Sequence, residues 1–185
     1  MLPEVSLLKA GSLLRDDAGN ILDARSSVTL ITSAVRIVVD TGLKGEEGLL
    51  LDALARKGLG PEDVDLIINS HRHPDHCGNN HLFPCSELIS PREGQRIAPG
   101  VVALETPGHT LDSISILVRS SSKVVVAGDA LPTFDNFIKC VPPALHVDRD
   151  LAISSIFRIL SVAEIVIPGH DRPFSVTERR YLQLP

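Results

Sequence analysis

The sequence of 185 residues contains no tryptophan, one tyrosine and one methionine, and aromatic residues make up only 3% of it. Leu, Ile, Val and Ala must therefore fill the interior, and 43% hydrophobic residues suffice for a core without disulfide cross-links. The three cysteines form no Cys-x-x-Cys pair, which argues against a disulfide framework and indicates reduced thiols. A formal net charge of -5 provides no general attraction for nucleic acid or for an anionic membrane.

Long apolar runs and targeting segments are also missing. No run reaches the roughly 20 residues of a membrane helix, because Arg36 and Asp40 interrupt the longest candidate. The first residues lack the basic start and the apolar length of a secretory signal. We therefore expect a cytoplasmic protein with no membrane contact, and a homodimer as the default assembly. No linker divides the chain, so we expect a single domain over residues 1–185.

Short β-type runs alternate with two segments of helical period. The pattern predicts a helix over 46–57, ended by Gly58, and another over 149–161, capped by Asp148. The segment 131–148 contains three prolines and is expected to be irregular. Strands come first in each half and a helix follows, which predicts an α/β protein with two sheets and helices outside them. The predicted strands cover residues 5–8, 12–14, 21–22, 28–31, 35–39, 64–68, 87–90, 101–104, 113–118, 123–127 and 164–167.

The segment from His71 to His76 contains four potential metal ligands directly after a predicted buried strand. Three imidazoles and a carboxylate are poor material for a core and good material for a metal site. His71 and His73 project from the same side of an extended segment, so they can share one ion at about 2.0–2.1 Å. Asp75 and His76 follow where the chain turns away, and they can reach a second ion.

Three later strands end at potential ligands in the same manner. His109 and His170 each follow a Pro-Gly turn, and Asp129 follows Gly128. One of these histidines alone is more often an ordinary surface or core residue, but the ordered set predicts a metal centre. The first expected site is His71, His73 and His109, the second is Asp75, His76 and His170, and Asp129 touches both. Each site keeps an open position for water, as catalytic zinc does.

The His-x-His-x-Asp-His string with a later His, Asp and His resembles the metallo-β-lactamase superfamily. The strings that end at His109 and Asp129, and the string around His170, are most similar to the family of metallo-β-lactamase domain-containing protein 1 and its small prokaryotic relatives. The resemblance implies an αββα sandwich, in which two mixed β-sheets carry helices on their outer faces. It also implies a hydrolase with two divalent metal ions, for which zinc is expected and iron or manganese suits the same ligands.

The resemblance implies a mechanism as well. A metal-bridging hydroxide would attack a small-molecule substrate of the ester, thioester, lactone or amide type. Asp75 would act as the catalytic residue that orients the nucleophile and accepts its proton. Asp40 would hold a ligand imidazole in the required tautomer from behind. The segment 131–148 follows a ligand, and its residues Phe134, Phe137, Lys139 and His146 are expected near the substrate, with Lys139 suited to an anionic group.

Two alternative functions stay open at this point. A compact phosphodiesterase or ribonuclease would need a basic strip beside the metals, and the acidic composition does not favour one. A persulfide-dioxygenase-like oxygenase shares the same string with a single iron, and a non-catalytic module would hold its metal in a closed shell. The ligands alone do not choose among these chemistries.

Overall fold

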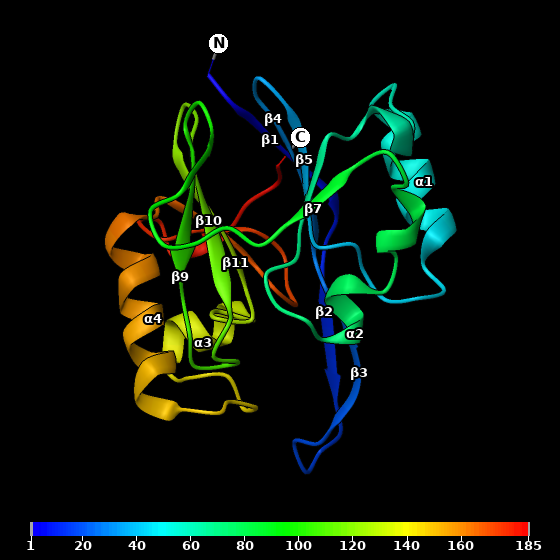
Figure 1. The fold of residues 1–185 in the computed structure, drawn as a ribbon. Helices are drawn as coiled ribbons and strands as arrows, with labels where there is room; N and C mark the ends of the chain where they lie inside the picture. Colours follow the sequence, from blue (N-terminus) through cyan, green and yellow to red (C-terminus); the bar gives the residue numbers. More distant parts are fainter. Residues whose placement is uncertain (1, 185) are drawn as a thin grey trace.

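A computed structural model describes residues 2–184, which form two facing β-sheets with helices on their outer sides (Figure 1). The first sheet has five strands, in the order β1, β4, β5, β6, β7. Its first two pairings are antiparallel and its last two are parallel, so the sheet is mixed. The strands are β1 (Glu4–Lys9), β4 (Val28–Thr32), β5 (Arg36–Val39), β6 (Leu66–Ile68) and β7 (Glu87–Ile89).

The second sheet has seven strands, in the order β14, β13, β12, β11, β10, β9, β8. It is also mixed, because β11 and β12 are parallel while the other pairs are antiparallel. The strands are β8 (Arg96–Ala98), β9 (Val101–Glu105), β10 (Ile114–Arg119), β11 (Lys123–Gly128), β12 (Ile165–Pro168), β13 (Phe174–Ser175) and β14 (Arg180–Tyr181).

A separate hairpin is made by β2 (Ser12–Arg15) and β3 (Ile21–Arg25), and it projects from one end of the sandwich (Figure 1). Leu13 lies opposite Ala24 in its register, and Arg15 lies opposite Ile21. Directly opposed residues share a face of a sheet, as do residues two apart. These four side chains therefore lie on one face of the hairpin.

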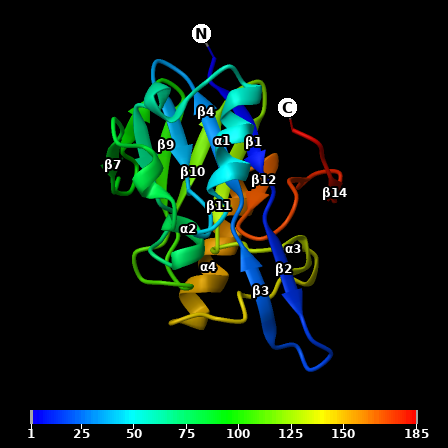
Figure 2. The same cartoon turned by 90° about the vertical axis from the view of Figure 1, so that its right-hand side faces the viewer.

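Helices cover both outer faces of the sandwich (Figure 1), and Figure 2 looks onto the face that α1 covers. Helix α1 (Glu47–Arg56) packs on the first sheet, while α3 (Phe134–Lys139) and α4 (Arg149–Val162) pack on the second. This arrangement confirms the predicted αββα sandwich of two mixed sheets. A short helix α2 (Pro74–Cys77) and two 3-10 turns, Pro61–Asp63 and Asn80–Leu82, complete the helical elements among residues 2–184. None of the helices in that range is both long and apolar enough to cross a membrane.

Successive side chains of a strand point to opposite faces of its sheet, so one strand can contribute both to the core between the sheets and to the core beneath the outer helices. In β11, Val124 and Val126 belong to the core between the sheets, whereas Val125 and Ala127 belong to the core beneath α3 and α4. Strand β11 is therefore apolar on both faces, as expected of a strand that is covered on both sides. Leu, Ile, Val and Ala supply nearly all of the core between the sheets, as the scarcity of aromatic residues predicts.

Both predicted helices are confirmed, but the segment 131–148 is more ordered than predicted. The carboxylate of Asp148 accepts hydrogen bonds from the first backbone amides of α4, which is the predicted N-cap. Helix α3 forms inside the segment expected to be irregular. The hydroxyl of Thr133 accepts a hydrogen bond from the backbone amide of Asn136, and this cap begins the helix. The Thr-x-x-Asn spacing was the available signal, and the three surrounding prolines obscured it.

Four of the six aromatic residues pack together at α3, and their packing gives a test of the core. Phe174 is fully buried, and its ring stacks on Phe137 with centroids 5.0 Å apart. We expect Phe174→Ala to lower the free energy of unfolding by about 3–5 kcal/mol, because a large buried ring leaves a cavity. Urea denaturation measures the change. Phe157→Ala is the matched control, since Phe157 is 57% exposed on α4, and equal losses in both variants would contradict this packing.

Candidate metal centre

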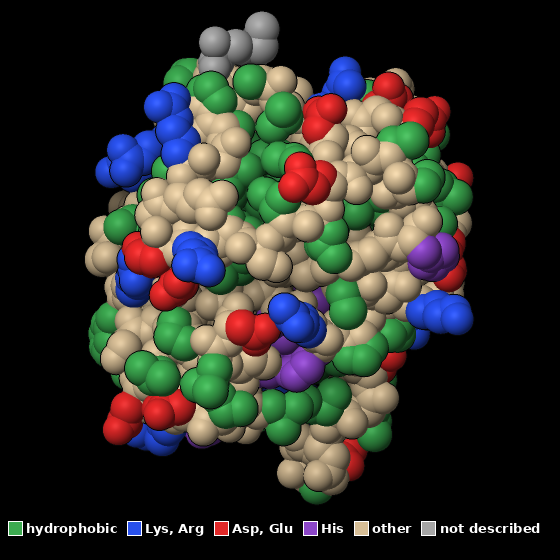
Figure 3. Space-filling view, viewed as in Figure 1, with side chains coloured by type: hydrophobic (Ala, Val, Ile, Leu, Met, Phe, Trp, Pro, Cys, Tyr) green, Lys and Arg blue, Asp and Glu red, His purple; other side chains and the backbone are tan. Residues whose placement is uncertain are grey.

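The predicted ligands converge on one rim of the sandwich. His71 and His73 follow β6, His109 follows β9, Asp129 follows β11 and His170 follows β12. Strands β9, β11 and β12 run in the same direction, so their carboxyl ends meet at one edge of the second sheet. The space-filling view shows histidine side chains reaching the surface near the middle of one face of the molecule (Figure 3).

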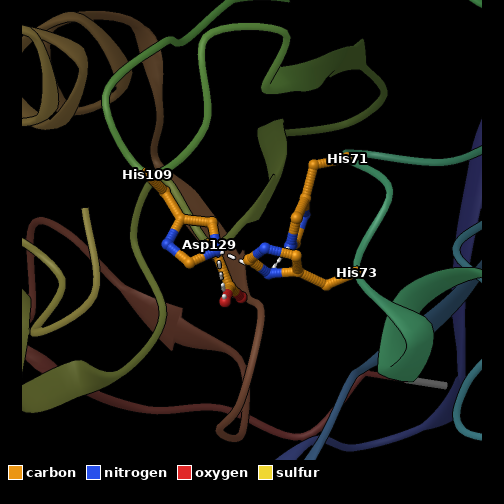
Figure 4. Close-up of side chains that lie close together, drawn as sticks. All are labelled: His71, His73, His109 and Asp129. Atoms are coloured by element: carbon orange, nitrogen blue, oxygen red, sulfur yellow. Dashed lines mark hydrogen bonds and ion pairs between the residues drawn. The ribbon is translucent and has the colours of Figure 1, made fainter. Parts of the chain in front are cut away.

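The first group consists of His71, His73, His109 and Asp129, whose potential ligand atoms all lie within 4.8 Å of one another. His71 and His73 approach from one side and His109 from the other, with Asp129 between them (Figure 4). His73 Nδ1 lies 2.9 Å from His71 Nε2 and 3.0 Å from His109 Nε2. The three imidazoles therefore direct a nitrogen each at one small volume.

The second group consists of Asp75, His76 and His170. Both residues from the first segment lie on α2, where Asp75 Oδ2 is 3.7 Å from His76 Nε2 and 3.5 Å from His170 Nε2. Asp129 Oδ1 lies 3.3 Å from His76 Nε2, while its Oδ2 lies 3.4 Å from His109 Nε2. The carboxylate of Asp129 thus contacts a histidine of each group, in the position expected of a bridging residue.

The donor set fits metal ions on two independent observations. His76 Nε2 and Asp129 Oδ1 are buried and have no hydrogen-bond partner among the described residues. Leaving such atoms unsatisfied costs about 1–3 kcal/mol each, so a missing partner is expected. In addition, two nitrogens bound tetrahedrally to one zinc ion would lie about 3.3 Å apart. The 2.9 and 3.0 Å separations in the first group are close to that value.

Hydrogen bonds behind the imidazoles set which nitrogen faces the centre. His76 Nδ1 lies 2.7 Å from Asp40 Oδ2, and His109 Nδ1 lies 2.7 Å from the carbonyl oxygen of Leu145. His170 Nδ1 lies 3.0 Å from the carbonyl oxygen of Arg25. A carbonyl only accepts, so Nδ1 of His109 and of His170 donates to it, and Nε2 keeps its lone pair for an ion. The carboxylate of Asp40 acts in the same way on His76.

Asp40 is held in place by more than its histidine. Its backbone has a φ of 59°, a left-handed conformation that is uncommon outside glycine. Ser70 donates to this carboxylate from its backbone amide at 2.7 Å and from its hydroxyl at 2.8 Å. Asp40 was predicted to hold an imidazole, and the structure places it against His76. Ser70 was not predicted, because nothing in the sequence distinguishes it from any other serine before a histidine.

Glycines let the backbone come close to the ligands. Gly169 precedes His170, and a Cβ atom there would collide with the carboxylate of Asp129. Gly128 precedes Asp129 and has a φ of +50°, and a Cβ there would lie 2.5 Å from the hydroxyl oxygen of Ser70. Both positions therefore need glycine for the ligands to assemble.

Charge and burial act on the histidines in opposite directions in the metal-free protein. Burial lowers the pKa of His71 to about 2, which keeps its imidazole neutral. Burial also opposes protonation of His76, but the carboxylates of Asp40 and Asp129 outweigh it and raise the pKa of His76 well above its ordinary value. The pKa of His170 is likewise raised despite its burial, chiefly by Asp129. The second group therefore retains protons that an ion must displace.

A cavity of about 180 Å³ opens over both groups. His73, Asp75, His109, Asp129 and His170 line its floor. The remaining lining is almost entirely apolar, and it comes from the hairpin and from the segment 131–148. These side chains are Leu13, Ile21 and Ala24 from the hairpin, and Pro132, Pro143, Ala144 and Leu145 from the segment. The hairpin's part in the site was not predicted, because the alternation of its residues does not reveal which face meets the ligands.

None of the four residues predicted near the substrate lines this cavity. Phe134 and Phe137 pack against Phe174 beneath α3, because their rings are needed in a core with few aromatics. Lys139 is exposed and pairs with Asp135 one helical turn away. His146 is exposed, with Nδ1 2.7 Å from the carbonyl oxygen of Pro143. The segment does border the cavity, but through two of its three prolines, Ala144 and Leu145.

Comparison with known proteins gives the class. Residues 23–84 match the family model described as the metallo-β-lactamase superfamily. The "Probable metallo-hydrolase" of Methanocaldococcus jannaschii is 37% identical over 146 residues, which cover 73% of this chain and 70% of that protein. Metallo-β-lactamase domain-containing protein 1 of Xenopus laevis is 36% identical over 188 residues, covering 91% of this chain and 80% of the relative. The chain belongs to the metallo-β-lactamase superfamily, as its motifs predicted.

A solved structure shows that the similarity includes the fold. An N-acyl homoserine lactone hydrolase, with the product N-hexanoyl-L-homoserine bound at its catalytic metal centre, superposes with a TM-score of 0.73. It is 26% identical, and the match covers 92% of this chain and 94% of that one. The chain is thus a metal-dependent hydrolase by family, and its rim of His and Asp residues is consistent with a metal site.

The close approach of Gly169 to Asp129 gives a test of the centre. We expect Gly169→Ala to reduce metal affinity at least tenfold, because the added methyl group would displace the carboxylate of Asp129. Mutations of residues that position metal ligands typically lower metal affinity by about 10–100-fold. Metal content after dialysis against a weak chelator measures the loss. Gly48→Ala on α1 is the matched control, since its Cβ would meet nothing within 4 Å. Equal metal retention in the two variants would contradict the geometry.

The raised pKa values of His76 and His170 predict a pH dependence with a definite sign. Metal ions bind the neutral imidazole, so binding must release the protons held there, and affinity rises with pH. We expect a steady gain from about pH 6 to about pH 8, with His71 contributing none because its pKa is about 2. Calorimetric titration in buffers of different ionisation enthalpy counts the protons. Affinity that stays constant over this range would refute the assignment.

Proposed function

We propose that this protein is a dinuclear metal-dependent hydrolase of ester, thioester, lactone or amide-type small molecules. One observation carries the proposal: two groups of ligands share the carboxylate of Asp129 beneath a single cavity. The first ion would be held by His71, His73 and His109, and the second by Asp75, His76 and His170. Zinc is the ion we expect. We further propose that residues 1–185 act as one domain of this kind, in the cytoplasm and as a homodimer.

Two ions bound in these groups would supply Lewis acids, which would activate water at neutral pH and polarise a substrate carbonyl. The chain supplies the geometry. Asp75 is 18% exposed and lines the cavity floor, which supports the proposal that its carboxylate would orient a water and accept its proton. Asp40 keeps the Nδ1 proton of His76 directed away from the centre. Hydrolysis consumes one water, breaks the acyl C–O, C–S or C–N bond, and leaves an acid with an alcohol, thiol or amine.

The cavity walls support a substrate with an apolar acyl group. Leu13, Ile21 and Leu145 stand over the ligands and would exclude bulk water from an acyl chain. A site for single-stranded RNA would instead present basic and aromatic side chains, and Arg15 is the one basic side chain in this lining. The apolar lining directly over the ligands therefore supports an acyl group at that place rather than a nucleotide.

Hydrolysis rates on a panel of acyl substrates test the proposal. Protein loaded with zinc should hydrolyse hexanoyl thioesters and N-hexanoyl homoserine lactone. Asp129→Ala should lower kcat by at least about 10²-fold, because the shared ligand is lost. Metal content, measured on the same samples, should fall with activity.

The control for folding is Asp52→Ala, a change of the same kind at an exposed carboxylate on α1. It should leave turnover and metal content unaltered. Wild-type protein with both ions bound that hydrolyses no acyl substrate in the panel would overturn the proposed reaction. Turnover with a single ion bound would overturn the dinuclear part alone.

A further inference from the structure

A second hollow adjoins the cavity over the metal centre. It is a groove of about 560 Å³ between β2, helix α3 and the chain that follows His170. Leu13, Arg15 and His170 line both the groove and the cavity, so the two spaces meet beside the second group of ligands. The cavity is apolar, whereas the groove is lined largely by charged and polar side chains. A molecule extending through both would therefore need an apolar part and a polar part.

The groove carries more positive than negative side chains, although the whole protein has a net charge of -5. Its cations are Arg15, Lys139 and Arg172, and its carboxylates are Asp135 and Asp171. Lys139 and Asp135 neutralise each other at 2.6 Å. The two arginines and Asp171 remain, and their hydrogen bonds decide what the groove can bind.

The carboxylate of Asp171 is already occupied by other donors. One oxygen accepts the backbone amide of Phe134 at 3.1 Å and the Tyr181 hydroxyl at 2.9 Å. The other accepts the backbone amide of Arg172 at 2.7 Å. The guanidinium of Arg172 lies over the Tyr181 ring instead, 4.2 Å from its centroid. Asp171 therefore fixes this corner of the groove and does not pair with the guanidinium of Arg172.

Arg15 is anchored but not neutralised. One of its guanidinium nitrogens donates to the carbonyl oxygen of Gly19 in the hairpin turn, at 2.8 Å. Ion pairs to carboxylates among residues 2–184 involve five other arginines, and neither Arg15 nor Arg172 is one of them. A guanidinium has five N–H donors in a planar fork that suits an oxyanion. Both arginines thus keep donors available in the groove.

We propose that the groove binds an oxyanion, such as a carboxylate, on the leaving-group side of the substrate, with Arg15 and Arg172 as specificity-determining residues. The inference rests on the proposed hydrolysis of acyl compounds and adds a substrate class to it. The acyl chain occupies the apolar cavity, the scissile carbonyl lies at the metal centre, and the anionic alcohol or thiol portion extends past His170 into the groove. Neutral substrates of the same size bind less tightly.

Two thioesters that differ only in charge test the assignment: S-hexanoyl-3-mercaptopropionate and S-hexanoyl-3-mercaptopropionamide. Zinc-loaded wild-type protein should prefer the anionic compound by about tenfold in kcat/KM, mostly through KM, as one charge-assisted hydrogen bond in a wet groove implies. The preference should shrink in 0.5 M salt, because exposed charges are screened. Arg15→Gln and Arg172→Gln should each reduce it severalfold, with the larger loss in kcat/KM on the anionic thioester.

Arg56→Gln is the matched control, since Arg56 is exposed on α1 over the other sheet. It should retain the full preference. Equal losses on both thioesters in the groove variants, or no preference in wild type, would overturn the inference. The corresponding S-hexyl thioethers, measured by calorimetry, separate binding from reaction. If neither thioester is hydrolysed but the anionic thioether still binds more tightly through Arg15, the proposed reaction fails while the oxyanion groove stands.

Discussion

The contact on which the metal centre depends is the one between the buried carboxylate of Asp129 and the histidines on either side of it. Burial disfavours a charged carboxylate, yet His76 and His170 hold the pKa of Asp129 well below its ordinary value. One of its oxygens has no hydrogen-bond partner among the described residues. An anion kept charged and incompletely satisfied in the interior is stable only beside cations. Gly128 and Gly169 allow the backbone to come close to this carboxylate, and the ends of β9, β11 and β12 bring the histidines and Asp129 to the same rim.

The clustering of the predicted ligands could be foreseen from sequence because the information for it is local. His71 and His73 are separated by one residue, and His109, Asp129 and His170 each follow an apolar strand, so strand direction alone brings them to one rim. The αββα sandwich followed from the motif resemblance and from the order of strands and helices. Helix α3 was missed, because its short cap signal competes with nearby prolines.

The parts of the site that sequence did not predict depend on tertiary placement. The carbonyl oxygens of Leu145 and Arg25 orient His109 and His170, and every residue has such a carbonyl. Leu13 lines the cavity only because the hairpin turns that face toward the ligands. Phe137 was assigned to the substrate on proximity in sequence to Asp129, but the need to fill the core under α3 decided its position. The candidate ligands could therefore be predicted from local sequence, whereas the residues that line the cavity could not.

The ligands do not come from a single layer of the sandwich. His71, His73, Asp75 and His76 are delivered by the first sheet, whereas His109, Asp129 and His170 are delivered by the second. An ion bound in either group would consequently be a cross-link between the two halves of the chain, 36 residues apart at the shortest span, from His73 to His109. Such a cross-link stabilises the folded state in proportion to the logarithm of free metal concentration. The stability of the fold would then depend on the same metal supply as its activity.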